Sequence, residues 1–196
     1  MSYSLSMAPS LPPDNPALRR FLRDVWAKEQ HPSWVHYVDT QSMAPSLHGP
    51  VDLCVQWGMC QPLQPGDLFV FEDPVLHILV AHRVCQVDES GGRVLQAGDR
   101  LLSRGIPGNW IGSDAVFGRV TALRWPGTPR GIGLNRPGVI WIGRQIARSS
   151  ARLWTENQGG PIPARMLHRA WCWAYRFALF ISQEVAHAKH VPIPQS

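Results

Sequence analysis

The spacing of hydrophobic and polar residues changes three times along the chain, and each spacing predicts a different kind of element. Residues 1–15 show no regular spacing and are rich in Ser and Pro, which predicts a disordered leader. After Asn15 and Pro16, apolar residues from Leu18 to Trp26 recur at helical intervals. The cap, the proline at the first helical position and this periodicity predict an amphipathic helix over residues 16–31.

From residue 34 to 124 the pattern changes to short β-type runs, separated by turns rich in Gly, Pro and Asp. The runs predict strands at Trp34–Val38, Leu53–Trp57, Asp67–Glu72, Ile78–Val87, Arg93–Ala97 and Ala115–Leu123. Short strands at such close spacing favour one strongly coiled small sheet or a partly open barrel. The expected fold class is therefore α+β, mainly β with flanking helices.

Residues 125–138, rich in Gly, Pro and Arg, are expected to be a linker to a C-terminal helical segment over 139–190. Two helix-like patterns lie in this segment, at 139–156 and 163–187. The second is very apolar and is interrupted by His168, Arg169 and Arg176. This pattern fits a helix lying in a membrane surface as well as one packed on its own domain or on a twin subunit, because an amphipathic pattern alone does not separate them.

Composition narrows the class of protein. With 44% apolar residues in 196, the chain is expected to bury a core. Its net charge of +5 suits an anionic membrane surface or a nucleic acid and does not select between them. No nucleic-acid partner is expected. The four cysteines form no zinc-type cluster and are expected to be free or buried thiols, so we predict no metal and no cofactor. We see no signal peptide and no membrane-spanning stretch, which predicts a cytoplasmic or peripheral membrane protein.

One hexapeptide, Ser-Met-Ala-Pro-Ser-Leu, occurs twice, at residues 6–11 and 42–47. A nucleophile must be held against its base within a fraction of an ångström. The copy at Ser42 follows one predicted strand and precedes another, whereas the copy at Ser6 lies in the leader. We therefore expect Ser42 to be the functional copy.

The order of short motifs around Ser42 resembles that of the signal-peptidase and repressor-cleavage superfamily of serine peptidases. The matching segments are Thr40–Leu47 (the Ser-Met-x-Pro box), Pro65–Phe71 (the Pro-Gly-Asp strand), Leu79–Val84 (the base strand), Gln96–Asp99 (the Gly-Asp box) and Val116–Val120 (the closing Gly-Arg strand). They span roughly residues 38–123. The leader and the C-terminal helices lie outside the resemblance.

The resemblance implies a catalytic role for several of these residues. Many members of the superfamily use a lysine as base, but Lys28 precedes the nucleophile box and Lys189 lies near the C-terminus. The aligned residue is His82, as in the serine–histidine branch typical of endoplasmic-reticulum and archaeal signal peptidases. The Ser42 backbone N–H and the Thr40 hydroxyl are the expected oxyanion donors.

Asp99 is the expected group that orients the histidine. The branch usually places another Asp five or six residues beyond the Gly-Asp box, where this chain has Arg104 and Gly105. This departure leaves three readings open: Asp99 completes a triad, the site is a Ser–His dyad, or activity is weakened.

The resulting functional hypothesis is a serine endopeptidase that binds a protein or peptide in extended form, with peripheral membrane contact through its C-terminal helix. Maturation of a dedicated precursor fits this hypothesis. The alternative is a catalytically weak or inactive peptidase-fold module that binds peptide or membrane. A self-cleaving repressor is disfavoured, because that branch uses lysine and the single N-terminal helix is too little for a helix-turn-helix.

Overall fold

The computed structural model describes residues 24–25, 28, 32–37, 41–58, 62–73, 78–100, 108–128, 131–155 and 162–188. The predicted leader lies outside these residues. Of the predicted helix over 16–31, only Asp24, Val25 and Lys28 are described as helical.

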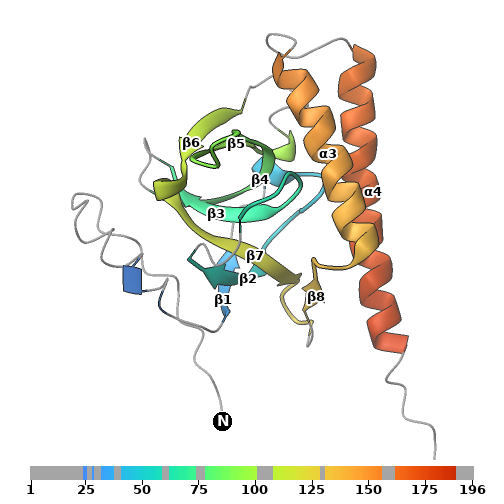
Figure 1. The fold of residues 1–196 in the computed structure, drawn as a ribbon. Helices are drawn as coiled ribbons and strands as arrows, with labels where there is room; N and C mark the ends of the chain where they lie inside the picture. The colour runs from blue at the N-terminus through green and yellow to red at the C-terminus, as the bar shows by residue number, and fades with distance from the viewer. Residues whose placement is uncertain are drawn as a thin grey trace, which may run out of the picture.

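In the described part of the chain, an antiparallel sheet of eight strands packs beside two long helices (Figure 1). The strands are β1 (Ser33–Tyr37), β2 (Val51–Trp57), β3 (Leu68–Glu72), β4 (Leu79–Val87), β5 (Arg93–Ala97), β6 (Asn109–Gly112), β7 (Val116–Arg124) and β8 (Ile132–Gly133). Their order is β1-β2-β7-β3-β4-β5-β6, with β8 paired to β7. The α+β class is confirmed, and the sheet does not close into a barrel.

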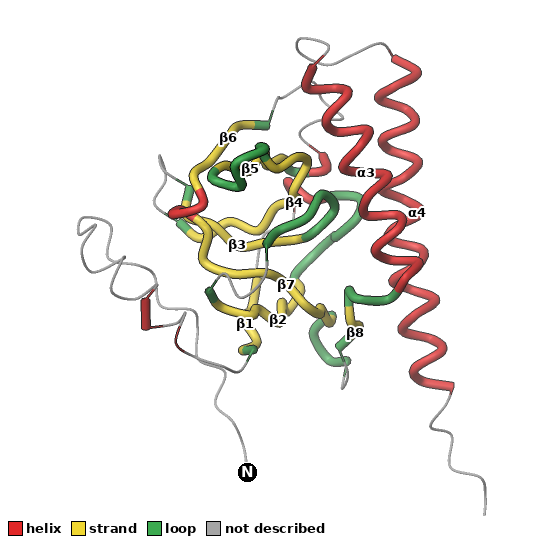
Figure 2. The backbone as a smooth tube through the Cα atoms, viewed as in Figure 1, coloured by secondary structure: helices red, strands yellow, loops and turns green. Residues whose placement is uncertain are grey.

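The helices are α3 (Pro137–Thr155) and α4 (Ile162–Ala188), which lie side by side on one flank of the strands (Figure 2). Pro137 begins α3, where its missing N–H costs nothing. No helix among the described residues is long and apolar enough to cross a membrane.

Each predicted strand overlaps an observed one, but β6 and β8 were not predicted. β6 has only four residues and begins at Asn109, inside a Pro-Gly-Asn sequence that is typical of a turn. β8 has two residues and lies in the region expected to be a linker. β6 forms because it pairs with β5, and β8 because it pairs with β7. Such pairing depends on the neighbouring strand, so the local sequence alone does not predict either strand.

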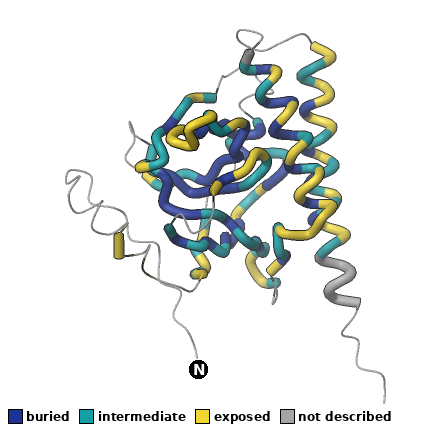
Figure 3. The backbone as a smooth tube through the Cα atoms, viewed as in Figure 1, coloured by how far each residue is buried: buried dark blue, intermediate teal, exposed yellow. Residues whose placement is uncertain are grey.

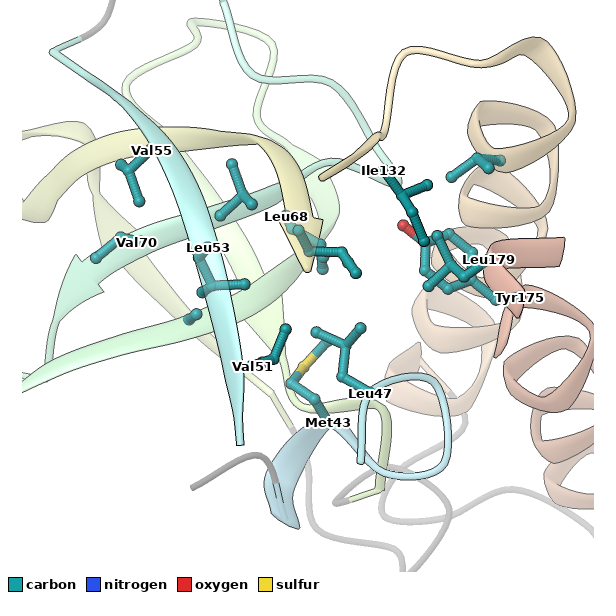
Figure 4. Close-up of a cluster of buried hydrophobic side chains, with 14 of the residues drawn as sticks. Met43, Leu47, Val51, Leu53, Val55, Leu68, Val70, Ile132, Tyr175 and Leu179 are labelled. Carbon is teal, nitrogen blue, oxygen red and sulfur yellow. The ribbon is translucent and has the colours of Figure 1, made fainter. Parts of the chain in front are cut away.

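The described residues form three buried hydrophobic clusters, and alternate residues of β3 face two of them, because side chains along a strand point to opposite faces of the sheet. Leu68 and Val70 of β3 belong to the larger core, which also includes Tyr175 and Leu179 of α4 (Figure 4). Phe69 and Phe71 belong to a second core on the other face. The helices therefore cover one face of the central strands.

Helix α3 approaches the β3 turn at two glycines. A Cβ on Gly66 would lie 2.8 Å from the backbone of Gly143 and Arg144, and Gly66 has φ of +102°. Only glycine fits both the close approach and this backbone conformation. The Pro-Gly-Asp motif thus places the turn before β3 directly against α3.

Candidate active site

Ser42 lies in η1 (Gln41–Met43), a single 3-10 turn between β1 and β2. The next residue, Met43, and then Leu47 point into the larger core and are almost fully buried (Figure 4). The Ala44 N–H donates a hydrogen bond to the Gln41 carbonyl and closes this turn. The bond that closes the turn therefore does not involve the Ser42 N–H, which is the expected oxyanion donor. The hydrophobic anchors fix the turn while Ser42 itself stays partly exposed.

Gly98 supports Ser42 from the other side. A Cβ at Gly98 would lie 2.6 Å from the Ser42 carbonyl oxygen and 3.0 Å from the Ser42 Cβ. The Gly-Asp box therefore includes a glycine because the backbone after β5 passes directly against the turn that carries Ser42. Two segments far apart in sequence thus hold Ser42 in place.

His82 lies in β4, opposite Phe69 of β3, and its ring is 5.7 Å from the Phe71 ring. Its Nε2 is 3.0 Å from the Ser42 Oγ, an ordinary hydrogen-bond distance. The sequence placed these two residues forty positions apart, and the structure brings them together. The contact is the one required for a base that accepts the serine proton.

The other ring nitrogen of His82, Nδ1, is 2.5 Å from the Gln96 Oε1. The Gln96 Nε2 in turn donates to the Asn109 Oδ1 of the next strand. With its amide nitrogen held by Asn109, Gln96 presents its oxygen to His82, and an oxygen acceptor requires the proton on Nδ1. The Nε2 lone pair is then free to accept the Ser42 proton.

Burial lowers the pKa of His82 below its ordinary value of 6.5, although the Gln96 hydrogen bond opposes this. Burial disfavours the charged form of histidine, which is why the pKa falls. At neutral pH the ring is therefore neutral and ready to act as a base.

Asp99 does not lie against the imidazole. Its two oxygens accept from the Arg83 Nε at 3.0 Å and Nη2 at 2.9 Å, and this pair is fully buried. Burial alone would raise the pKa of Asp99, but the Arg83 charge overrides it and holds that pKa below its usual range. The expectation that Asp99 orients His82 thus differs from the geometry, in which Gln96 holds that position.

The Arg83–Asp99 pair joins the sheet to both helices. Arg83 Nη1 donates to the Gly66 carbonyl at the α3 contact, and its guanidinium lies 4.5 Å from the centre of the Tyr175 ring in α4. The Asp99 carbonyl is 2.9 Å from His168 Nε2 of α4. Because Arg83 follows His82 and Asp99 follows Gly98, this buried network fixes the two segments that carry the site.

Thr40, the other expected oxyanion donor, and Ser6, in the first copy of the hexapeptide, lie outside the described residues. The Ser42 backbone N–H stays the expected oxyanion donor. No group of three or more metal-ligating side chains occurs in the part of the chain that the structure describes.

A separate cavity of about 660 Å³ lies between the Pro65–Leu68 turn, β7 and α3. Arg119 and Arg144 line it, and neither Ser42 nor His82 does. Arg119 is paired with Asp67 at 2.9 Å, and Arg144 donates to Gln64 at 3.1 Å. The cavity is therefore distinct from the Ser42–His82 contact.

Sequence reasoning missed Gln96 and Asn109 as members of the site. The available signal was Gln96 itself, a polar residue in the otherwise apolar half of β5, two positions before the glycine that supports Ser42. Asn109 gave no comparable signal, because β6 was not recognised as a strand. No family model, curated protein or solved structure matches the chain.

Proposed function

We propose that this protein is a serine endopeptidase, with Ser42 as nucleophile and His82 as general base, of the signal-peptidase and repressor-cleavage type. The observation that carries the proposal is the 3.0 Å contact between Ser42 Oγ and His82 Nε2, on a ring whose Nδ1 is held by Gln96. The motif order around these residues supports the same conclusion.

The geometry supports a two-step hydrolysis. Ser42 Oγ attacks the carbonyl carbon of the scissile bond while its proton moves to His82 Nε2. The imidazolium then gives this proton to the leaving amine, and the peptide C–N bond breaks to leave an acyl ester on Ser42. Water, deprotonated by His82, attacks the ester and releases the carboxylate and free Ser42. Gln96 keeps the ring oriented throughout.

An extended substrate is supported by the pairing of β4. Residues Leu79–Val87 form one strand, but β3 pairs with its first half, from Leu79 to Arg83, and β5 with its second half, from Arg83 onward. The segment just before and including His82 thus has a strand on one side only, among the described residues. Main-chain addition of a peptide to such an edge is a common mode of recognition. By resemblance to the family, the residue before the scissile bond is small.

The first experiment is cleavage of a proteome-derived peptide library, followed by mass spectrometry of the products. Wild type is expected to cut, and Ser42→Ala and His82→Ala are each expected to lose activity by about 10⁴-fold or more. Ser6→Ala is the matched control, because Ser6 begins the same hexapeptide, and it should cut like wild type. Equal cleavage by Ser42→Ala and wild type would overturn the proposal.

A second candidate, a peptide-binding module with little or no catalysis, is favoured by one observation. The group at His82 Nδ1 is a neutral amide, which stabilises the imidazolium less than a carboxylate does. If wild type retains library peptides without cutting them, and Ser42→Ala retains them equally, the binding module is the correct function.

A further inference from the structure

Helix α4 exposes a continuous apolar surface on the side opposite its buried face. Its inward positions His168, Cys172, Tyr175 and Leu179 are fully buried at intervals of three and four residues. The outward stripe, which we call the α4 stripe, comprises Ile162, Met166, Trp173, Phe177, Phe180 and Ile181. Exposed positions recur along the helix from Ile162 to Ile181 (Figure 3).

The stripe is too exposed and too apolar to be an ordinary solvated helix face. Met166 is 66% exposed, Phe177 63% and Trp173 55%. Large contiguous apolar patches of this kind mark interaction surfaces. Trp141 of α3, also exposed, packs edge-on against Trp171, which carries the apolar surface toward the seam between the two helices.

Positive charge borders the stripe. At 100° per residue, Arg165, Arg169 and Arg176 project along one flank of α4, beside Trp173 and Phe180. The Arg176 guanidinium lies 5.4 Å from the Trp173 ring centre. From Pro137 to Ala188, which spans α3 and α4, the sequence contains six arginines and two acidic residues, Glu156 and Glu184. An apolar face bordered by cations and aromatic rings matches the interface of a lipid bilayer.

We propose that the α4 stripe docks on an anionic membrane surface, with α4 in the plane of the interface. The rings and aliphatic side chains enter the boundary between headgroups and acyl chains, and the flanking arginines contact lipid phosphates. The charge favours this occupant over a second copy of the chain, because a twofold contact through the stripe would bring arginine-rich helices together.

The docked orientation places the peptidase site close to the lipid. The inner face of α4 contacts the Asp99 carbonyl through His168, and Gly98, one residue earlier, touches Ser42. A helix with its side chains is about 10–12 Å across. The turn that carries Ser42 is therefore separated from the docking face by little more than one helix.

Co-sedimentation of the full chain with vesicles tests the proposal. Wild type should bind vesicles of phosphatidylcholine with about one third phosphatidylglycerol, and bind pure phosphatidylcholine far more weakly. Phe177→Ser should weaken binding by about tenfold or more, because it removes a large inserted ring. Arg169→Gln should weaken it by about fivefold and reduce its dependence on salt.

Matched controls come from elsewhere on the surface. Ile78→Ser removes an apolar residue between β3 and β4 that is 51% exposed, and Arg93→Gln removes an exposed arginine of β5; both should bind like wild type. The proposal is overturned if wild type ignores anionic vesicles or if the two Ser variants lose binding equally. It is also overturned if light scattering shows a dimer that Phe177→Ser dissolves, since the stripe would then be an interface between copies. Circular dichroism of each variant verifies that it is folded.

Discussion

At the scale of single residues, the central feature is an amide where a triad usually has a carboxylate. Gln96 can orient His82 through one hydrogen bond, but it adds no negative charge beside the ring. The nearest buried carboxylate, Asp99, is neutralised by Arg83. A charged His82 ring is therefore stabilised first by the Gln96 hydrogen bond and then by the more distant charges of Asp99 and Asp73. In the proposed reaction, this balance sets the pH at which the ring becomes protonated.

Because burial keeps the pKa of His82 below 6.5, kcat/KM should rise with pH through an acid limb below that value and level off before neutral pH. Gln96→Glu should move this limb to higher pH, because a carboxylate favours the charged ring. Gln96→Leu should lower kcat by roughly 10²–10⁴-fold through loss of orientation. The measurement is kcat/KM on one identified peptide from pH 5 to 9.

Gln86→Leu is the control for this series, since Gln86 lies on the same strand as His82 but is exposed. An unchanged profile in Gln96→Glu would show that Gln96 does not contact the ring during catalysis.

Gly98 offers a test of nucleophile positioning. Gly98→Ala puts a methyl group against the Ser42 carbonyl, so the turn must shift. A shift near 1 Å is expected to lower kcat by about 10²-fold. Gly138→Ala is the control, because a Cβ there meets no atom within 4 Å. Equal kcat values for the two variants would contradict a positioning role for Gly98.

At the scale of elements, the half-paired β4 strand has one of its backbone groups already occupied. The Ala81 N–H donates to the Tyr37 hydroxyl of β1 at 3.2 Å, one residue before His82. A substrate strand that used this N–H would have to displace that hydroxyl. β1 thus contributes a side chain to the edge where the peptide is proposed to add.

Tyr37→Phe should therefore lower KM for extended peptides by a few-fold and leave kcat nearly unchanged. The variant removes the hydroxyl that accepts the Ala81 N–H, so a substrate carbonyl can accept this hydrogen bond without displacing it. Steady-state kinetics on the same peptide measures this split. A higher KM would show that the Tyr37 hydroxyl assists binding.

The elements also show what sequence could and could not predict. The runs that became β3, β4 and β5 were recognisable because their apolar residues fill the buried clusters on the faces of the sheet. Ser42 and His82 were predicted from short motifs, and the structure shows that the two side chains are in contact. The role of Gln96 could not be predicted from the sequence, because it depends on how β4, β5 and β6 are aligned in the sheet. That register is set by packing between segments far apart in the chain. Asp99 was assigned a catalytic role because it lies in the Gly-Asp box. In the structure it pairs instead with Arg83, which follows His82 in β4 and so points to the other face of that strand.

At the scale of the whole molecule, the Arg83–Asp99 pair links the sheet, the segment that supports Ser42 and the two helices. Asp99→Asn leaves the Arg83 charge buried without its partner, which should lower the free energy of unfolding by about 3–5 kcal/mol. Urea denaturation of Asp88→Asn, whose arginine partner is exposed, should show a midpoint close to wild type. If both variants unfold at the same urea concentration, the buried pair is not a structural link.

Stability should also depend on mildly acidic pH. Burial lowers the pKa of His168 below 6.5, while Asp99 and Arg83 face it with opposite effects. The unfolded chain takes up a proton more readily than the native ring does, so the free energy of unfolding should fall as the pH drops below 6.5 toward the native pKa. His168→Gln should flatten this part of the curve. Urea titrations at several pH values from 4 to 8 would reveal the difference.

The contacts of α4 with the Asp99 carbonyl and with Arg83 have a consequence for biosynthesis. A ribosome makes the strands that carry Ser42 and His82 well before it makes α4, yet His168 and Tyr175 of that helix complete the network behind them. The nascent chain therefore holds both reactive groups before it holds the support that positions them. The proposed peptidase activity should therefore appear only after α4 has left the exit tunnel and has packed behind the site, so that neighbouring nascent proteins meet an inactive chain until then.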